Sequence, residues 1–128
     1  MLVVDTSAIV TLLVEDPPVP ALAARLSGQQ LHAPHLVDVE FLHVLRRLAA
    51  RSRVTPMRAS LLRQDFAGLQ ITRYPHRLFL DRMWDLRDNL TAYDAAFVAL
   101  SEALDAPLVT TDARLAAAPG HRAVIEAY

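Results

Sequence analysis

The sequence predicts an α/β fold in which about five parallel strands form a central sheet with helices packed on both faces. Short apolar runs typical of buried strands alternate along the chain with segments whose apolar residues recur at helical spacing. Strands that alternate with helices in this way are typical of a parallel sheet. The 128 residues suit one domain, and no repeat, linker or low-complexity segment divides residues 1–128.

Five segments have the length and composition of strands. They are residues 2–4, 31–33, 69–72, 108–110 and 123–125. The first is Leu2-Val3-Val4, a short apolar run that fits a fully buried strand. Residues 69–72 alternate apolar and polar side chains, which favours a position near an edge of the sheet.

Seven segments between these strands are predicted to be helical. They are residues 8–14, 20–26, 35–51, 56–67, 76–87, 92–104 and 113–118. Pro17 and Pro18 stop the first helix, because proline cannot continue a helix. Gly28 suits the left-handed position after the second helix. Thr55 caps the fourth, and Pro56 takes its first position.

The longest predicted helix, residues 35–51, has one apolar face. Its buried stripe is expected to comprise Val37, Phe41, Val44, Leu45 and Leu48. Glu40 lies at the edge of that stripe, where a partly desolvated carboxylate needs a cation or a hydrogen-bond donor. Asp38 is expected to serve the helix N-terminus. Elsewhere, Trp84 and Tyr93 are expected to pack within the fold, and His32 to lie at the surface.

The composition excludes several classes of function. The formal net charge is −1, so any contact with nucleic acid must be local. All 13 basic residues are arginine, and the absence of cysteine excludes disulfides and thiolate catalysis. No apolar run approaches the ~20 residues of a membrane span, and the N-terminus lacks the pattern of a signal peptide. We therefore expect a soluble cytoplasmic protein with no membrane partner.

Four acids fall at equivalent places in the predicted topology. Asp5 follows the first strand directly, and Asp112 follows the strand at residues 108–110. Asp94 lies in the first turn of the helix that leads into that strand, and Glu40 lies one turn deeper in its own helix. Because the carboxyl ends of parallel strands and the N-termini of the following helices share one edge of the sheet, these side chains are expected to converge.

Each acid also has a purely structural explanation. Asp94 stands three residues after Thr91, which is the spacing of a capping box. Asp112 and Asp5 precede or begin helices, where the helix dipole favours a negative charge. Glu40 is the hardest to explain in this way, because it lies on a second turn beside apolar neighbours.

Four converging carboxylates would repel one another unless a divalent cation neutralised them. Hard oxygen ligands suit Mg²⁺ or Mn²⁺. A magnesium ion on carboxylates usually holds waters and substrate phosphates in its remaining positions. The acids therefore favour metal-assisted hydrolysis of a phosphodiester by an activated water.

Four stretches of the sequence carry a resemblance to a known family. They are MLVVDTSA at residues 1–8, LVDVE at 36–40 leading to Leu45-Arg46-Arg47, TAYDAAFVAL at 91–100 and LVTTDARL at 108–115. In this order they resemble a PIN domain and, more narrowly, the VapC-type ribonuclease toxins of bacterial toxin–antitoxin pairs. The resemblance extends from the first residue to about Leu115.

The resemblance implies a three-layer α/β/α domain with the activity of an endoribonuclease dependent on Mg²⁺ or Mn²⁺. It maps the four catalytic and metal-binding acids onto Asp5, Glu40, Asp94 and Asp112. It also implies a homodimer that a small cognate antitoxin protein inhibits. The small polar residues beside the acids are expected to hydrogen-bond a carboxylate or a metal-bound water; they are Thr6, Ser7, Thr110 and Thr111.

Two alternatives remain open. Arg46 and Arg47 are either contacts for RNA phosphate or part of a solvated helix end, where cations suit the dipole. The chain as a whole is either a nuclease or a non-catalytic PIN-like binding module that holds a protein or RNA partner. A phosphatase of the haloacid dehalogenase type is disfavoured, because Ser7 occupies the position of its second aspartate and the chain has no lysine.

Overall fold

The central sheet is parallel and five-stranded. The computed structural model describes residues 1–128, and its strands are β1 (Leu2–Val4), β2 (Leu31–Pro34), β3 (Ile71–Tyr74), β4 (Leu108–Thr110) and β5 (Ile125–Ala127). They lie in the order β3-β2-β1-β4-β5, with every neighbouring pair parallel. The predicted parallel α/β sheet with helices on both faces is therefore confirmed.

Seven α-helices and one 3₁₀ turn connect the strands. They are α1 (Thr6–Val14), α2 (Pro20–Leu26), α3 (Leu36–Ala50), α4 (Pro56–Gly68), the 3₁₀ turn η1 (His76–Phe79), α5 (Leu80–Asp85), α6 (Ala92–Leu104) and α7 (Ala113–Ala117). No helix is both long and apolar enough to cross a membrane.

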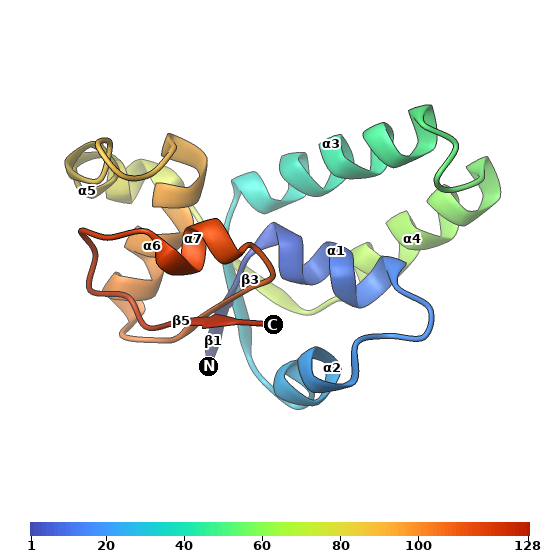
Figure 1. Cartoon of the computed structure of the whole chain (residues 1–128), viewed down its shortest axis with the longest axis horizontal. Coiled ribbons are helices and arrows are strands. Elements are labelled where there is room, and N and C mark those ends of the chain that lie inside the picture. Colours follow the sequence, from blue (N-terminus) through green and yellow to red (C-terminus); the bar gives the residue numbers. More distant parts are fainter.

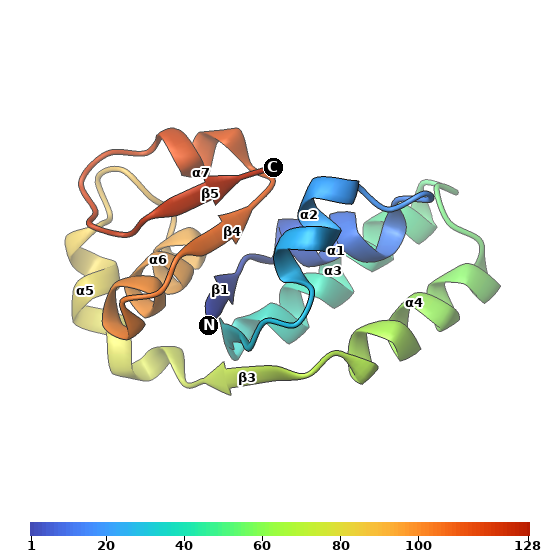
Figure 2. The same cartoon turned by 90° about the horizontal axis from the view of Figure 1, so that it is seen from below.

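The strand order assigns the helices to two faces. The chain moves outward in one direction from β1 through β2 to β3, and then returns to β4 and moves outward to β5 on the other side. Because crossovers between parallel strands are right-handed, α1, α3 and α4 cover one face, while α5, α6 and α7 cover the other. Figures 1 and 2 show these two groups of helices on opposite sides of the strands.

The core is densest around β1 and α6. All three residues of β1 are buried between β2 and β4, and residues 95–101 of α6 are buried without interruption. Three of these are alanines, so the helix backbone can approach the sheet closely. On the other face, Phe41 of α3 stacks on Phe66 of α4 with ring centroids 4.0 Å apart. The position and length of β1 and α6 agree with the sequence prediction.

Both edge strands begin two residues later than predicted. The strand expected at 69–72 is β3 at Ile71–Tyr74, and the strand expected at 123–125 is β5 at Ile125–Ala127. Each has a single neighbour, so the local pattern sets its register only weakly. In β3, the observed register brings Arg73 to Asp38 of α3, and the two form an ion pair of 2.8 Å. Asp38 therefore pairs with a distant arginine as well as lying in the first turn of α3.

The helix predicted at 76–87 is interrupted. The chain forms η1 and then the short α5, because the backbone at Phe79 leaves helical geometry with φ −114° and ψ 8°. Trp84 was expected to pack inward and is instead 68% exposed. His32 was expected at the surface and is buried in β2, where its Nδ1 lies 2.9 Å from the Tyr74 hydroxyl.

Candidate functional site: an acidic cluster beyond β1 and β4

Asp5 lies at the point where the strand order reverses, between the carboxyl ends of β1 and β4. In open α/β sheets this switch point is where ligands bind. The backbone N–H of Asp5 donates to the Val109 carbonyl at 2.9 Å, which holds the residue against β4. Its side chain is 6% exposed. A buried carboxylate needs hydrogen-bond donors, and two hydroxyl groups supply them.

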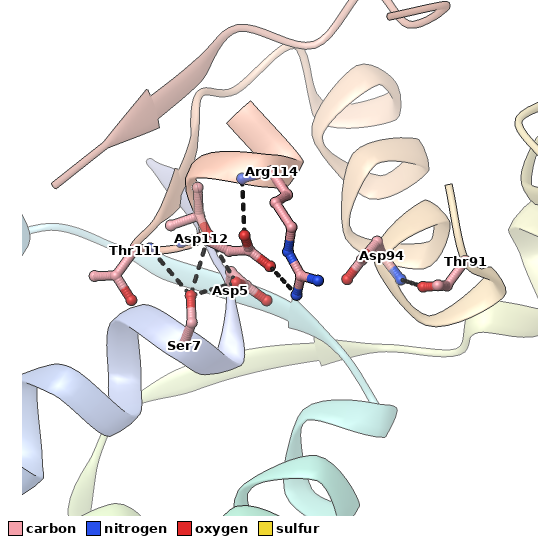
Figure 3. Close-up of polar contacts among 8 residues, drawn as sticks. Asp5, Ser7, Thr91, Asp94, Thr111, Asp112 and Arg114 are labelled. Atoms are coloured by element: carbon pink, nitrogen blue, oxygen red, sulfur yellow. Dashed lines mark hydrogen bonds and ion pairs between the residues drawn. The ribbon is translucent and has the colours of Figure 1, made fainter. Parts of the chain in front are cut away.

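The hydroxyls of Ser7 and Thr110 both donate to one oxygen of Asp5. Thr110 Oγ1 lies 2.8 Å from Asp5 Oδ2, and Ser7 Oγ donates to the same atom (Figure 3). The second oxygen, Oδ1, accepts no hydrogen bond from the protein. One oxygen of the buried carboxylate is therefore held in place while the other stays free for a ligand.

The same two hydroxyls also fix the start of α7. Ser7 Oγ accepts from the backbone N–H of Thr111 at 3.0 Å, and Thr110 Oγ1 accepts from that of Asp112 at 3.0 Å. The hydroxyl of Thr111 lies 3.2 Å from that of Thr11 on α1, so Thr111 supports the cluster through its main chain.

Glu40 reaches the cluster from the second turn of α3. Thr6 Oγ1 donates to Glu40 Oε2 at 2.5 Å, which joins α3 to the residue that follows Asp5. Burial raises the pKa of Glu40 above its usual range. The Thr6 hydrogen bond lowers that pKa, whereas the negative charges of Asp5 and Asp94 raise it further. The carboxylate therefore carries a charge that the protein only partly compensates.

Asp94 enters from the opposite face, in the first turn of α6. Thr91 caps this helix by accepting a hydrogen bond from the Asp94 backbone N–H at 3.1 Å, as the spacing predicted. Burial raises the pKa of Asp94, and the charges of Asp5 and Asp112 raise it further. The charge of Asp5 thus acts on both Asp94 and Glu40, which links the acids electrostatically.

Asp112 differs from the other acids because a cation accompanies it. Its Oδ1 accepts from the Arg114 backbone N–H at 2.8 Å, and its Oδ2 lies 3.5 Å from the Arg114 guanidinium. Although burial raises the pKa of Asp112, these contacts hold it below its usual value. Figure 3 shows Arg114 reaching from α7 toward the space between Asp112 and Asp94. The Arg114 side chain is 93% exposed.

The structure therefore brings the four predicted acids to one edge of the sheet without closing them around an ion. No three histidine, cysteine, aspartate or glutamate side chains are arranged to hold a metal ion. A cavity of about 570 Å³ opens beside the cluster, lined by Asp5, Thr6, Ser7, Val39, Glu40, His43, Val44 and Tyr93. Its lining combines carboxylates and hydroxyls with apolar and aromatic side chains.

Two residues of the site have roles that the sequence did not predict. Tyr93 was expected to pack within the fold, but it is 66% exposed on the wall of this cavity. The sequence signal was its place beside Asp94 at the start of α6. Arg114 was not singled out, although the Asp-Ala-Arg order after β4 indicates a cation near Asp112. Arg46 and Arg47 lie toward the other end of α3, away from the acids.

The chain is thus a three-layer α/β/α protein with four carboxylates at the carboxyl ends of β1 and β4. In this class of fold, that position is where ligands bind. The family model of the PIN domain matches residues 2–120, and the chain belongs to the PIN domain family.

Relatives with similar sequences extend over most of the chain. VapC ribonuclease Mb0985 of Mycobacterium bovis is 45% identical over 115 residues, which cover 90% of this chain and 88% of that protein. Ribonuclease VapC12 of Mycobacterium tuberculosis is 39% identical over 98% of both chains.

Solved structures share the fold. The crystal structure of PAE2754 from Pyrobaculum aerophilum has a TM-score of 0.70 at 25% identity, and covers 97% of this chain and 81% of that one. FitAcB from Neisseria gonorrhoeae has a TM-score of 0.65 at 13% identity over 90% of both chains, which shows a common fold alone.

Proposed function

We propose that this protein is an endoribonuclease that hydrolyses RNA phosphodiester bonds and acts as the toxin of a VapBC toxin–antitoxin pair. The observation that carries the proposal is the position of four carboxylates at one sheet edge in a chain 39–45% identical to VapC ribonucleases. Residues 1–128 would form a single PIN domain, and its RNA substrates would be those of the cytoplasm.

The donor set of the site suits a hard divalent cation. Asp5 Oδ1 is free of protein hydrogen bonds, and burial, followed by the charges of neighbouring acids, raises the pKa of both Glu40 and Asp94. Magnesium usually binds one or two carboxylates and keeps several waters, so it does not require a closed cage of acids. We therefore propose that the site takes Mg²⁺ or Mn²⁺. Such an ion, when bound, activates a water and stabilises charge on the phosphodiester.

The side chains would divide the remaining work. Asp5 and Asp94 would be the principal metal ligands, since Asp5 ends the central strand β1 and Asp94 lies in the first turn of α6. Glu40 and Asp112 would bind through water or hold a second ion, and one of them would orient the attacking water. Thr6 would hold Glu40 in position, and Ser7 and Thr110 would hold Asp5.

Substrate and partner contacts are proposed on separate surfaces. Arg46 and Arg47 would contact RNA phosphate, because guanidinium groups bind phosphate oxygens in pairs. A homodimer would cover apolar side chains that the monomer leaves exposed. Val39 and Leu42 lie one turn apart on α3, and Leu80 and Trp84 lie one turn apart on α5. A cognate antitoxin protein would inhibit the enzyme.

Cleavage of a total bacterial RNA pool tests the proposal. Purified protein would be incubated with Mg²⁺ or Mn²⁺ or with EDTA, and an Asp94→Asn variant would be run alongside. Discrete fragments that need metal and disappear in the variant support the nuclease. If the protein binds metal, carries no inhibitor and still cuts nothing, it is instead the PIN-like binding module. Cleavage that survives Asp94→Asn places the active site elsewhere.

A further inference from the structure

Three arginines converge on a second cavity at the far end of α3. Arg47, Arg51 and Arg53 line a space of about 500 Å³ together with Val14, Glu15, Val44 and Leu48. None of the three takes part in an ion pair, although Glu15 lines the same space. Like charges that share a cavity repel one another, and a bound anion would relieve that repulsion.

The end of α3 is built so that the chain turns back over this cavity. Ser52 adopts a left-handed backbone with φ 55°. The backbone N–H of Arg53 donates to the Leu48 carbonyl at 2.8 Å, and that of Ser52 donates to the Ala49 carbonyl at 3.0 Å. These two bonds form a Schellman motif. The motif fixes the backbone of Arg53 beside the last turn of the helix, and its exposed side chain lines the same space as those of Arg47 and Arg51.

The arginine cavity adjoins the acidic one. Val44 lines both the cavity that contains Asp5 and Glu40 and the cavity that contains the three arginines. The two spaces therefore neighbour each other along α3, and we call the pair together the α3 groove. From Glu40 to Arg51 the helix advances 11 residues, or about 16 Å at 1.5 Å per residue. The groove is acidic at one end and basic at the other.

We infer that the basic end of the α3 groove binds the phosphate backbone of the RNA strand that flanks the cleavage point. This inference rests on the proposed ribonuclease function. A strand whose scissile phosphate sits at the acids must continue across the neighbouring surface, and the α3 groove leads from there to three unpaired cations. At a stacked spacing of about 3.4 Å per nucleotide, 16 Å corresponds to roughly five nucleotides.

Two simpler explanations account for less of the arrangement. Cations near a helix C-terminus are favoured by the dipole, but the dipole does not require that they share one cavity or adjoin the acids. An acidic segment of a protein partner would also be attracted to the arginines. RNA presents one phosphate at the acids and others a few nucleotides further along at the arginines, so RNA is the occupant that the neighbouring positions of the two cavities favour.

Binding of RNA to a catalytically silent protein tests the inference. The parent protein would carry Asp94→Asn, so that binding is measured without cleavage. The groove variant would carry Arg47→Gln and Arg51→Gln in addition, because glutamine keeps helix propensity and removes charge. The matched control would carry Arg63→Gln and Arg77→Gln, two exposed arginines that take part in no ion pair and lie outside the groove. Thermal unfolding would confirm that all the proteins are folded.

We expect the groove variant to bind a ten-nucleotide single-stranded RNA roughly tenfold or more weakly than the parent. The slope of log K against log salt should fall by about 1.4, since each phosphate contact on a single strand contributes about 0.7. The gain in affinity on lengthening the RNA from four to ten nucleotides should appear in the parent and control and be lost in the groove variant.

Other results overturn the inference and separate it from the proposed function. Equal weakening in the control would show that overall charge, not the groove, attracts RNA. Unchanged RNA binding with loss of antitoxin binding would assign the basic end to the protein partner. In both cases the wild-type chain would still cleave RNA. If wild type cleaves nothing and the Asp94→Asn parent binds no RNA, the proposed function itself fails.

Discussion

The hydroxyl of Thr6 donates a 2.5 Å hydrogen bond to Glu40 Oε2, and thereby ties the helix that follows Asp5 to the second turn of α3. Thr6 is buried, and Glu40 is partly buried. The bond lowers the pKa of a carboxyl group that burial raises. It therefore has two effects, since it sets the position of Glu40 and favours the charged form of its carboxyl group.

Replacing Thr6 by valine should remove both effects while conserving shape. We expect the pKa of Glu40 to rise and the acidic limb of the pH–kcat/KM profile to move to higher pH, with a loss in kcat of roughly tenfold. A buried carboxylate that loses a donor costs about 1–3 kcal/mol. Thr6→Ser should restore both quantities. Thr11→Val, which changes a hydroxyl outside the acid cluster, should leave the profile where it is; an equal shift in that control would contradict the assignment.

The acid cluster should make the metal-free protein more stable as the pH falls. Burial and neighbouring charges raise the pKa of Glu40 and Asp94, so the folded chain binds these protons more tightly than the unfolded chain. The increase in the free energy of unfolding begins as the pH falls through the raised pKa values of the folded chain. It is complete below the ordinary carboxyl pKa of about 4. Asp94→Asn should melt a few degrees above wild type at pH 7.5 without metal, and this difference should shrink at pH 5.

Calorimetry with and without Mn²⁺ checks this prediction. Manganese should raise the melting temperature of wild type at pH 7.5 and have little effect on Asp94→Asn, because the ion stabilises only the state that it binds. Asp65→Asn on the exposed face of α4 is the matched control and should behave as wild type does. A wild-type protein whose stability ignored Mn²⁺ would argue against a metal at this site.

Arg114 should compete with a metal ion for Asp112. Its guanidinium lies 3.5 Å from Asp112 Oδ2. A metal ion bound by the acids would occupy the same region. An exposed pair of this kind is worth at most about 1 kcal/mol, so Arg114→Ala should tighten Mn²⁺ binding by up to roughly fivefold in a calorimetric titration. The backbone bond from residue 114 to Asp112 remains in the variant. Arg77→Ala should leave the affinity unchanged, and weaker Mn²⁺ binding by Arg114→Ala would refute the competition.

Local sequence signals predicted the parts of the site that depend on neighbours along the chain. The apolar run before Asp5 predicted β1, and Thr91 predicted the start of α6 and hence the place of Asp94. The shared edge of the sheet then followed from the parallel topology. These inferences succeeded because strand ends and helix caps are fixed within a few residues.

Contacts between distant segments were beyond the reach of the same signals. Arg73 pairs with Asp38 across 35 positions, and that contact accompanies a register of β3 that the sequence placed two residues too early. His32 looked like a surface residue because its partner, Tyr74, comes from another strand. Trp84 was placed inward by helical periodicity, which fails where η1 interrupts the helix. The errors at β3 and Trp84 concern an edge strand and a short helix, where few local residues constrain the result, and the error at His32 concerns a partner on another strand.

Glu102 should be the most important ionic residue for stability outside the site. Its side chain is 4% exposed and accepts from Arg82 at 2.7 and 2.9 Å and from the Arg122 backbone N–H at 2.8 Å. It thereby joins α6 to α5 and to the segment before β5. Glu102→Gln keeps the shape and removes the charge, and we expect it to lower the free energy of unfolding by about 1–3 kcal/mol at pH 7.

Glu126 provides a matched comparison, because it binds Arg25 through a similar two-bond contact at 2.7 and 3.0 Å but is 28% exposed. Glu126→Gln should therefore cost less than about 1 kcal/mol in urea unfolding. The hydrogen bond from Arg82 holds the pKa of Glu102 below its usual value. The stability it contributes is present above the unfolded value of about 4.3 and is lost as the pH falls through the lower folded value. The difference in free energy of unfolding between wild type and Glu102→Gln should thus be constant from pH 6 to 8 and shrink below about pH 4. Equal losses of stability in Glu102→Gln and Glu126→Gln would show that burial does not set the strength of these ion pairs.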